Sequence, residues 1–173
     1  MDHVRNCEAD ITNGLSRSFS ESQQMAIRAE MARLEHADEK ALDDLCADSE
    51  ARRLRWFSEN REPFDFIGND LLLSAYSLLL RRFGITPEDA PVVSSTDKEL
   101  VFHSKNFCPT LEACVLLGLD TRHVCQRMNE RSTDLLIKQL DKRLTFSRNY
   151  EKLRPYAAYC EEMISIADNQ ENA

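Results

Sequence analysis

Two stretches of sequence decide the fold: ELVFHSKNFCPTLEACVLLGLDTRHVC over residues 99–125, and YAAYCEEMISI over residues 156–166. The first stretch begins with a short alternating pattern typical of a strand, and a Cys-Pro junction then leads into a helical pattern that stops at Gly118. Between residues 99 and 166 lie four of the six cysteines: Cys108, Cys114, Cys125 and Cys160. We therefore look for a functional site in this part of the chain.

The strand pattern at residues 100–104 places His103 on the face opposite Leu100 and Phe102. A pair of β-branched residues at 92–93 precedes it after Pro91. The two short runs can pair as a hairpin.

Two helical patterns follow, one over residues 111–117 with Thr110 as its expected cap and one from about residue 121 to 140. Residues 144–148 alternate like a strand. Residues 159–166 alternate weakly, and periodicity alone leaves both helix and strand open there.

Residues 19–60 are helical in pattern. Ser20 and Gln23 form a capping-box pattern before the first helix. A second pattern covers residues 37–60, and its polar centre suggests either a break or an arm that reaches a partner chain. We expect the basic cluster in this helix to face solvent; it consists of Arg52, Arg53 and Arg55.

The best-defined helix covers residues 71–83 and is expected to be the buried central one, because its apolar positions surround most of its circumference. Asn69 or Asp70 caps its start, Gly84 closes it in the left-handed conformation, and Pro87 prevents its continuation.

Composition limits the partners of the chain. The 173 residues carry 22 basic and 30 acidic side chains, a net charge of −8, which argues against nucleic acid and anionic membranes as partners. The longest apolar run is too short to span a bilayer, and the N-terminus has no secretory pattern. We therefore expect a cytoplasmic protein with reduced thiols.

We expect one domain. Residues 1–18 lack periodicity and are interpreted as a flexible N-terminal arm. Residues 19–173 form the domain, with a helical extension at 19–60 and a core at 61–173 that carries the cysteine site.

Cys108 is the first candidate for reactivity, because a thiol at a helix N-terminus can have a lowered pKa. The cysteine spacing contains no CxxC and matches no zinc ribbon or ferredoxin, so simple core packing stays open. His103 is a candidate base or ligand for this thiol, or an ordinary core or surface histidine. Asp134 either faces solvent or points into a cleft beside Cys125.

The string FCPTLEACVLLGLDTRHVCQRM, followed by TDLLIKQLDKRLTFSR and a late YC, resembles the C-terminal part of the L-2-amino-thiazoline-4-carboxylic acid hydrolase-like family. A more distant likeness is to the vinyl-reductase (V4R) small-molecule-binding domains. The resemblance covers roughly residues 100–166. Cys108 with Pro109 fits the first motif, Cys125 the second and Cys160 the last, and Asp134 is a looser fit.

The resemblance implies an α+β fold in which a helical N-terminal half packs on a small antiparallel sheet, with two helices inserted between strands. It favours a strand at residues 160–166 and brings Cys108, Cys125 and Cys160 to one end of the sheet. These three residues are then metal ligands or pocket wall, and the metal would be zinc or an iron–sulfur centre.

Three functions remain open. The first is a hydrolase of a small cyclic C–N compound, with Cys108 as nucleophile and His103 or Asp134 as proton carrier. The second is a V4R-like module that binds a small molecule without turnover. The third is a helical interaction protein that forms a homodimer through its N-terminal helices and whose cysteines only pack.

Overall fold

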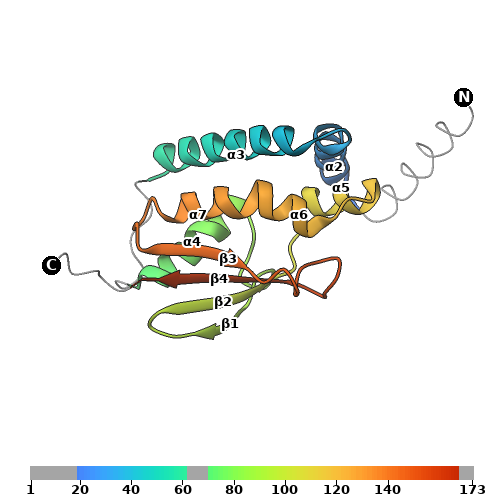
Figure 1. Ribbon diagram of the computed structural model, residues 1–173. Helices are drawn as coiled ribbons and strands as arrows, with labels where there is room; N and C mark the ends of the chain where they lie inside the picture. The colour runs from blue at the N-terminus through green and yellow to red at the C-terminus, as the bar shows by residue number, and fades with distance from the viewer. Residues whose placement is uncertain (1–18, 62–69, 168–173) are drawn as a thin grey trace, which may run out of the picture.

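The computed structural model describes residues 19–61 and 70–167, drawn in colour in Figure 1. The expected arm at residues 1–18 lies outside the described residues. The elements follow one another in this order: α2 (Glu21–Leu34), α3 (Glu39–Glu59), α4 (Leu71–Phe83), β1 (Val92–Ser95), β2 (Glu99–Ser104), α5 (Pro109–Leu117), α6 (Thr121–Cys125), a π-helical segment (Gln126–Glu130), α7 (Arg131–Ile137), β3 (Leu144–Arg148) and β4 (Cys160–Ile166).

The four strands form one antiparallel sheet in the order β1-β2-β4-β3. The helices α5 to α7 lie between β2 and β3 in the chain, and residues 160–166 are a strand. The predicted α+β fold, the hairpin and the inserted helices are therefore confirmed.

The described helices lie on one side of the sheet (Figure 1). α4 and α7 pack directly against the strands, while α3 packs on α7 and α2 packs on α5. The N-terminal helices thus form an outer layer that rests on other helices rather than on the sheet. In the described part of the chain, no helix combines the length and apolar character needed to cross a bilayer.

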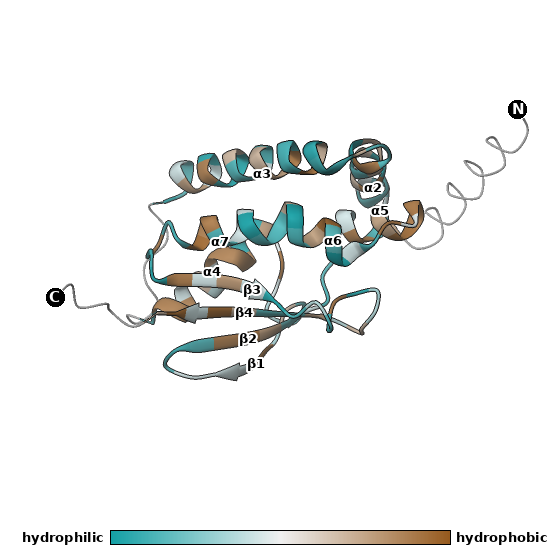
Figure 2. Ribbon diagram, viewed as in Figure 1, coloured by the Kyte–Doolittle hydropathy of each residue, from teal (hydrophilic) through white to brown (hydrophobic). Residues whose placement is uncertain are grey.

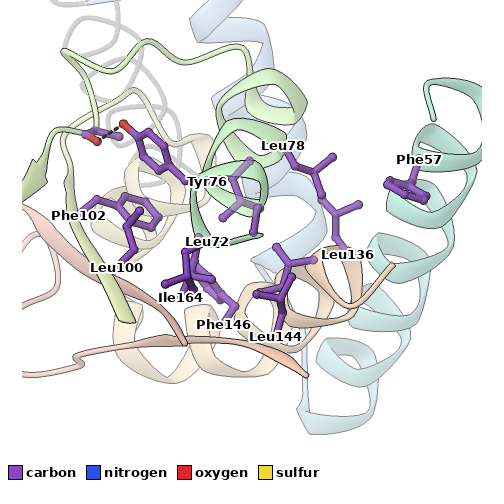
Figure 3. Packing of buried hydrophobic residues seen from close by; sticks show 14 residues of the cluster. Phe57, Leu72, Tyr76, Leu78, Leu100, Phe102, Leu136, Leu144, Phe146 and Ile164 are labelled. Carbon is purple, nitrogen blue, oxygen red and sulfur yellow. Dashed lines mark hydrogen bonds between the residues drawn. The ribbon is translucent and has the colours of Figure 1, made fainter. Parts of the chain in front are cut away.

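The main core lies between the sheet and the helices α4 and α7, and Phe57 of α3 belongs to the same cluster (Figure 3). The ring of Tyr76 contacts Phe102 edge-on, with centroids 5.2 Å apart, and its hydroxyl donates to the carbonyl of Ala90 at 2.7 Å. Asp70 caps α4 through the Leu73 amide, and Gly84 closes it with φ +63°, as predicted.

Figure 2 shows that α3 is mostly hydrophilic, whereas α4 is mostly hydrophobic. α3 is nevertheless continuous through its polar centre. Of the two alternatives for this centre, the break is therefore excluded, and the solvent-facing interpretation of Arg53 is wrong. Residues 46, 49, 53 and 57 recur at helical spacing, and all four side chains are buried: Cys46, Ser49, Arg53 and Phe57.

The outer edge of β3 is held by two carboxylates of the inserted helices. Asp134 accepts the amide N–H of Phe146 at 2.9 Å, and Glu130 accepts that of Arg148 at 3.0 Å. An edge strand leaves every second N–H without a strand partner, so these carboxylates supply the missing acceptors.

Candidate functional site

A cavity of about 350 Å³ lies at one end of the helix-facing side of the sheet. Its wall comes from elements that are far apart in the sequence: the middle of α3, the end of α4, the end of β2, the starts of α5 and α6, the π-helical segment, the end of β3, and the start of β4. The cavity therefore exists only once all the layers have assembled.

Cys108, Cys125 and Cys160 all line this cavity. Cys108 is the N-cap of α5, which starts at Pro109, and Cys160 opens β4 opposite Ser104. The other described cysteines lie elsewhere: Cys114 is buried between α5 and its neighbouring helices, and Cys46 is buried on α3. The three cysteines that the resemblance singled out are the three that meet.

The start of α5 differs from the prediction in one respect. Thr110 is not the cap, because the helix begins one residue earlier. Its buried hydroxyl instead donates to Glu30 on α2 at 2.7 Å. This bond ties the outer helical layer to the wall of the cavity.

The Cys108 thiol does not have the lowered pKa expected at a helix N-terminus. Burial raises the pKa of Cys108, although the Leu111 amide and the Arg148 and Arg154 charges oppose it. Burial also raises the pKa of Cys125 to about 11, against the opposing effect of Arg148, whose Nη1 lies 3.2 Å from the Cys125 Sγ. Both thiols are therefore protonated at neutral pH.

Metal binding receives no support from the geometry. Within residues 19–61 and 70–167, no three His, Cys, Asp or Glu side chains are grouped so that they could hold a metal ion. The convergence of Cys108, Cys125 and Cys160 on one cavity is looser than a zinc or iron–sulfur site requires.

His103 and Asp134 are not among the residues that line the cavity. The alternation of β2 directs Ser104 toward the cavity and His103 to the opposite face, where its ring stacks on Tyr159 and its Nε2 lies 3.2 Å from Glu161. Asp134 is occupied by the Phe146 amide and by Lys138, at 2.6 Å. The geometry gives neither residue a position from which to act on Cys108.

The charged residues of the cavity were not anticipated. Arg148 and Glu162 lie on neighbouring strands and pair through Nε and Oε1 at 2.8 Å, with side chains only 11% and 12% exposed. The second carboxylate oxygen of Glu162 accepts the Ser104 hydroxyl at 3.0 Å. The sequence held a signal for this pair, because residues 144, 146 and 148 alternate onto one face of β3.

Arg53 lies on α3, in the outer helical layer, and its side chain lines the cavity. It is 7% exposed, and its Nη1 donates to the Asn129 carbonyl at 3.1 Å, to the Thr133 hydroxyl at 2.7 Å and to the Ser132 hydroxyl. The Asn129 carbonyl belongs to the π-helical segment, a local widening often found at functional sites. Arg154 also lines the cavity and binds the carbonyls of residues 105 and 106.

The site thus combines three guanidinium groups, one carboxylate, three thiols and an apolar wall. Such a lining can hold a small organic molecule with both a polar and an apolar part. Comparisons with protein-family models, with curated proteins and with solved structures gave no match to this chain.

Proposed function

We propose that this chain is a small-molecule-binding module whose ligand occupies the cavity lined by Cys108, Cys125 and Cys160. The observation that carries the proposal is the cavity itself. Its volume of about 350 Å³ lies in the range of ligand pockets, and its wall mixes apolar side chains with a few polar groups.

Binding without turnover fits the chemistry of the lining better than catalysis does. The Cys108 and Cys125 thiols are held protonated by burial, and Glu162 is engaged by Arg148 and Ser104. The described lining contains no imidazole that could take a proton from Cys108. These features favour the V4R-like function over the hydrolase.

The test is thermal unfolding of the protein with three matched acid and amide pairs of increasing size: nicotinate and nicotinamide, benzoate and benzamide, and 2-naphthoate and 2-naphthamide. A compound that binds the native state raises Tm. We expect at least one compound to do so, and Cys160→Phe, which fills the cavity, to abolish the shift.

Met163→Phe is the matched control, because Met163 lies on the same strand but pairs with Val101 on the opposite face of the sheet. It should leave the shift intact. If no compound raises Tm, or if Cys160→Phe leaves the shift unchanged, the proposed binding function is wrong.

Hydrolysis of a small cyclic C–N compound is the second candidate, favoured by the meeting of Cys108 with Cys125 and Cys160 at one cavity. It is tested by incubating the protein with 2-amino-2-thiazoline-4-carboxylate and separating the products by chromatography. Ring opening that is lost in Cys108→Ser supports a hydrolase, whereas an unchanged substrate leaves binding alone.

Homodimerisation through α2 and α3 and a cytoplasmic location stay predictions. Met25 on α2 is 61% exposed and is the apolar side chain that a dimer through this helix would cover. Sedimentation of the wild type and of Met25→Asp tests the dimer. A monomer at all concentrations would contradict it.

A further inference from the structure

Arg53 keeps part of its hydrogen-bonding capacity unused. All three of its hydrogen bonds to the described residues are made by Nη1. In that part of the chain, Nε and Nη2 have no acceptor, although the side chain is 93% buried and lines the cavity. One face of the guanidinium lies over the Phe83 ring, 5.1 Å from its centroid.

Arg53 also lacks a counter-charge. Among the described residues it forms no ion pair, and its partners are two hydroxyls and a carbonyl. A buried cation is costly unless an anion faces it. Burial, helped by the charges of Arg148 and Arg82, lowers the pKa of Arg53 to about 9, so the group is still a cation at neutral pH.

Neither of the other arginines of the cavity has both Nε and Nη2 free, because Arg148 uses its Nε and Arg154 uses its Nη2. Arg148 pairs with Glu162, and Arg154 donates to two backbone carbonyls. The cavity therefore holds three cations against one carboxylate, in a chain whose net charge is −8. The excess positive charge is local to the cavity. Arg154, like Arg53, forms no ion pair among the described residues, so it is the free pair of Nε and Nη2 donors that distinguishes Arg53.

We infer that the ligand of the cavity is a small organic carboxylate whose acid group binds the Nε and Nη2 edge of Arg53; the inference rests on the proposed binding function. That edge presents two parallel N–H groups, the arrangement that matches the two oxygens of a carboxylate. The body of the ligand lies against the apolar wall of the cavity, which includes Ile85, Phe107, Leu111 and Leu153.

The position of Arg53 explains why the anion belongs there. Its Nη1 is held by Ser132, Thr133 and the Asn129 carbonyl, so the guanidinium is fixed before the ligand arrives. A fixed donor pair loses little conformational entropy on binding. The anion also supplies the counter-charge that the described protein side chains do not.

The experiment measures Kd by calorimetry for the three acid and amide pairs, on the wild type, Arg53→Gln and Arg55→Gln. We expect each acid that binds to do so at least tenfold more tightly than its amide. Arg53→Gln should remove this preference. Arg55→Gln, which deletes the same charge from an exposed position on the same helix, should keep it.

Equal binding of acids and amides to the wild type would overturn the inference and leave the proposed binding function standing. Retention of the acid preference in Arg53→Gln would also overturn it. If no member of the panel binds the wild type, the inference falls together with the proposed function.

If Arg53→Gln fails to fold, Arg53→Lys replaces it in the calorimetric measurement. It keeps the charge but lacks the paired N–H groups, so the acid preference should fall severalfold while thermal unfolding stays cooperative. An undiminished preference in folded Arg53→Lys would contradict the two-donor geometry.

Discussion

The helix-facing side of the sheet has an apolar half and a polar half. One half is a dry core in which Leu100, Phe102 and Ile164 pack beneath α4 and are at most 1% exposed. The other half, two to four residues further along the same strands, carries Ser104, Arg148, Cys160 and Glu162 and borders the cavity. The register is unbroken between them.

The difference shows how one sheet face can serve both stability and binding. In the apolar half, α4 covers the strands and every side chain finds an apolar neighbour. In the polar half, a buried charge needs a partner of opposite charge, and Glu162 and Arg148 supply this for each other. Substitutions on either side of this boundary should therefore have different consequences for stability and for binding.

The largest effect is expected in the apolar half. Phe102→Ala removes a fully buried ring and should lower the free energy of unfolding by about 4 kcal/mol. Cys160→Ala, at the border of the cavity, should cost about 1 kcal/mol or less, because the space beside it is already open. Urea unfolding measures both; equal losses would mean that the two halves pack alike.

Glu162→Gln breaks the ion pair within the polar half. Removal of one partner leaves Arg148 buried without its counter-charge, so we expect a loss of about 3 kcal/mol in urea unfolding. Asp44→Asn, in the exposed pair with Lys40 on α3, should leave stability unchanged. A harmless Glu162→Gln would show that Arg148 is solvated.

The two carboxylates along β3 separate the halves further. Asp134→Ala frees the Phe146 amide in the apolar half, and Glu130→Ala frees the Arg148 amide in the polar half. Each should cost about 2 kcal/mol, because each removes a charged acceptor. Only Glu130→Ala should weaken ligand binding in calorimetry. Loss of binding in Asp134→Ala alone would return Asp134 to the site.

The smallest effect concerns the opposite face of the sheet. Hydrogen bonds from Lys152, Asn149 and His103 lower the pKa of Glu161 to about 2. Because the folded pKa is depressed, the stabilisation is present above the unfolded value of about 4.3 and is lost as the pH falls toward 2. The difference in unfolding free energy between wild type and Glu161→Gln should therefore shrink from pH 7 to pH 3. At pH 7 the substitution should leave ligand binding unaffected, because Glu161 does not line the cavity. A gap that does not change with pH would refute this pairing.

Much of the fold could be predicted, because caps, helix-ending residues and apolar periodicity are enough to define most of its helices and strands. Residues 71–83 have an apolar circumference, an Asp cap and a closing glycine, and the helix has those bounds. Alternation alone predicts the strand at residues 144–148. At residues 160–166 alternation leaves helix and strand open, and the family resemblance favours the strand. The polar centre of α3 misled because its partner, α7, lies some 80 residues further along the chain.

The site could be predicted in part. The position of Cys108 at a helix start predicts its interest, whereas Cys125 and Cys160 depend on the family resemblance; all three line the cavity. His103 was attractive only because it is close in sequence to Cys108; the alternation of β2 already placed it on the other face. Arg53 was missed because arginine in a charge-rich helix is usually solvated.

Caps, breakers and periodicity act over a few residues, so they predict the elements, the hairpin and Cys108 as the first candidate thiol, while the family resemblance adds Cys125 and Cys160. The burial of Arg53, the pairing of Arg148 with Glu162 and the protonated state of the Cys108 and Cys125 thiols follow only from the tertiary structure. Desolvation and charge pairing depend on which layers close over a group, and no local pattern along the chain records that.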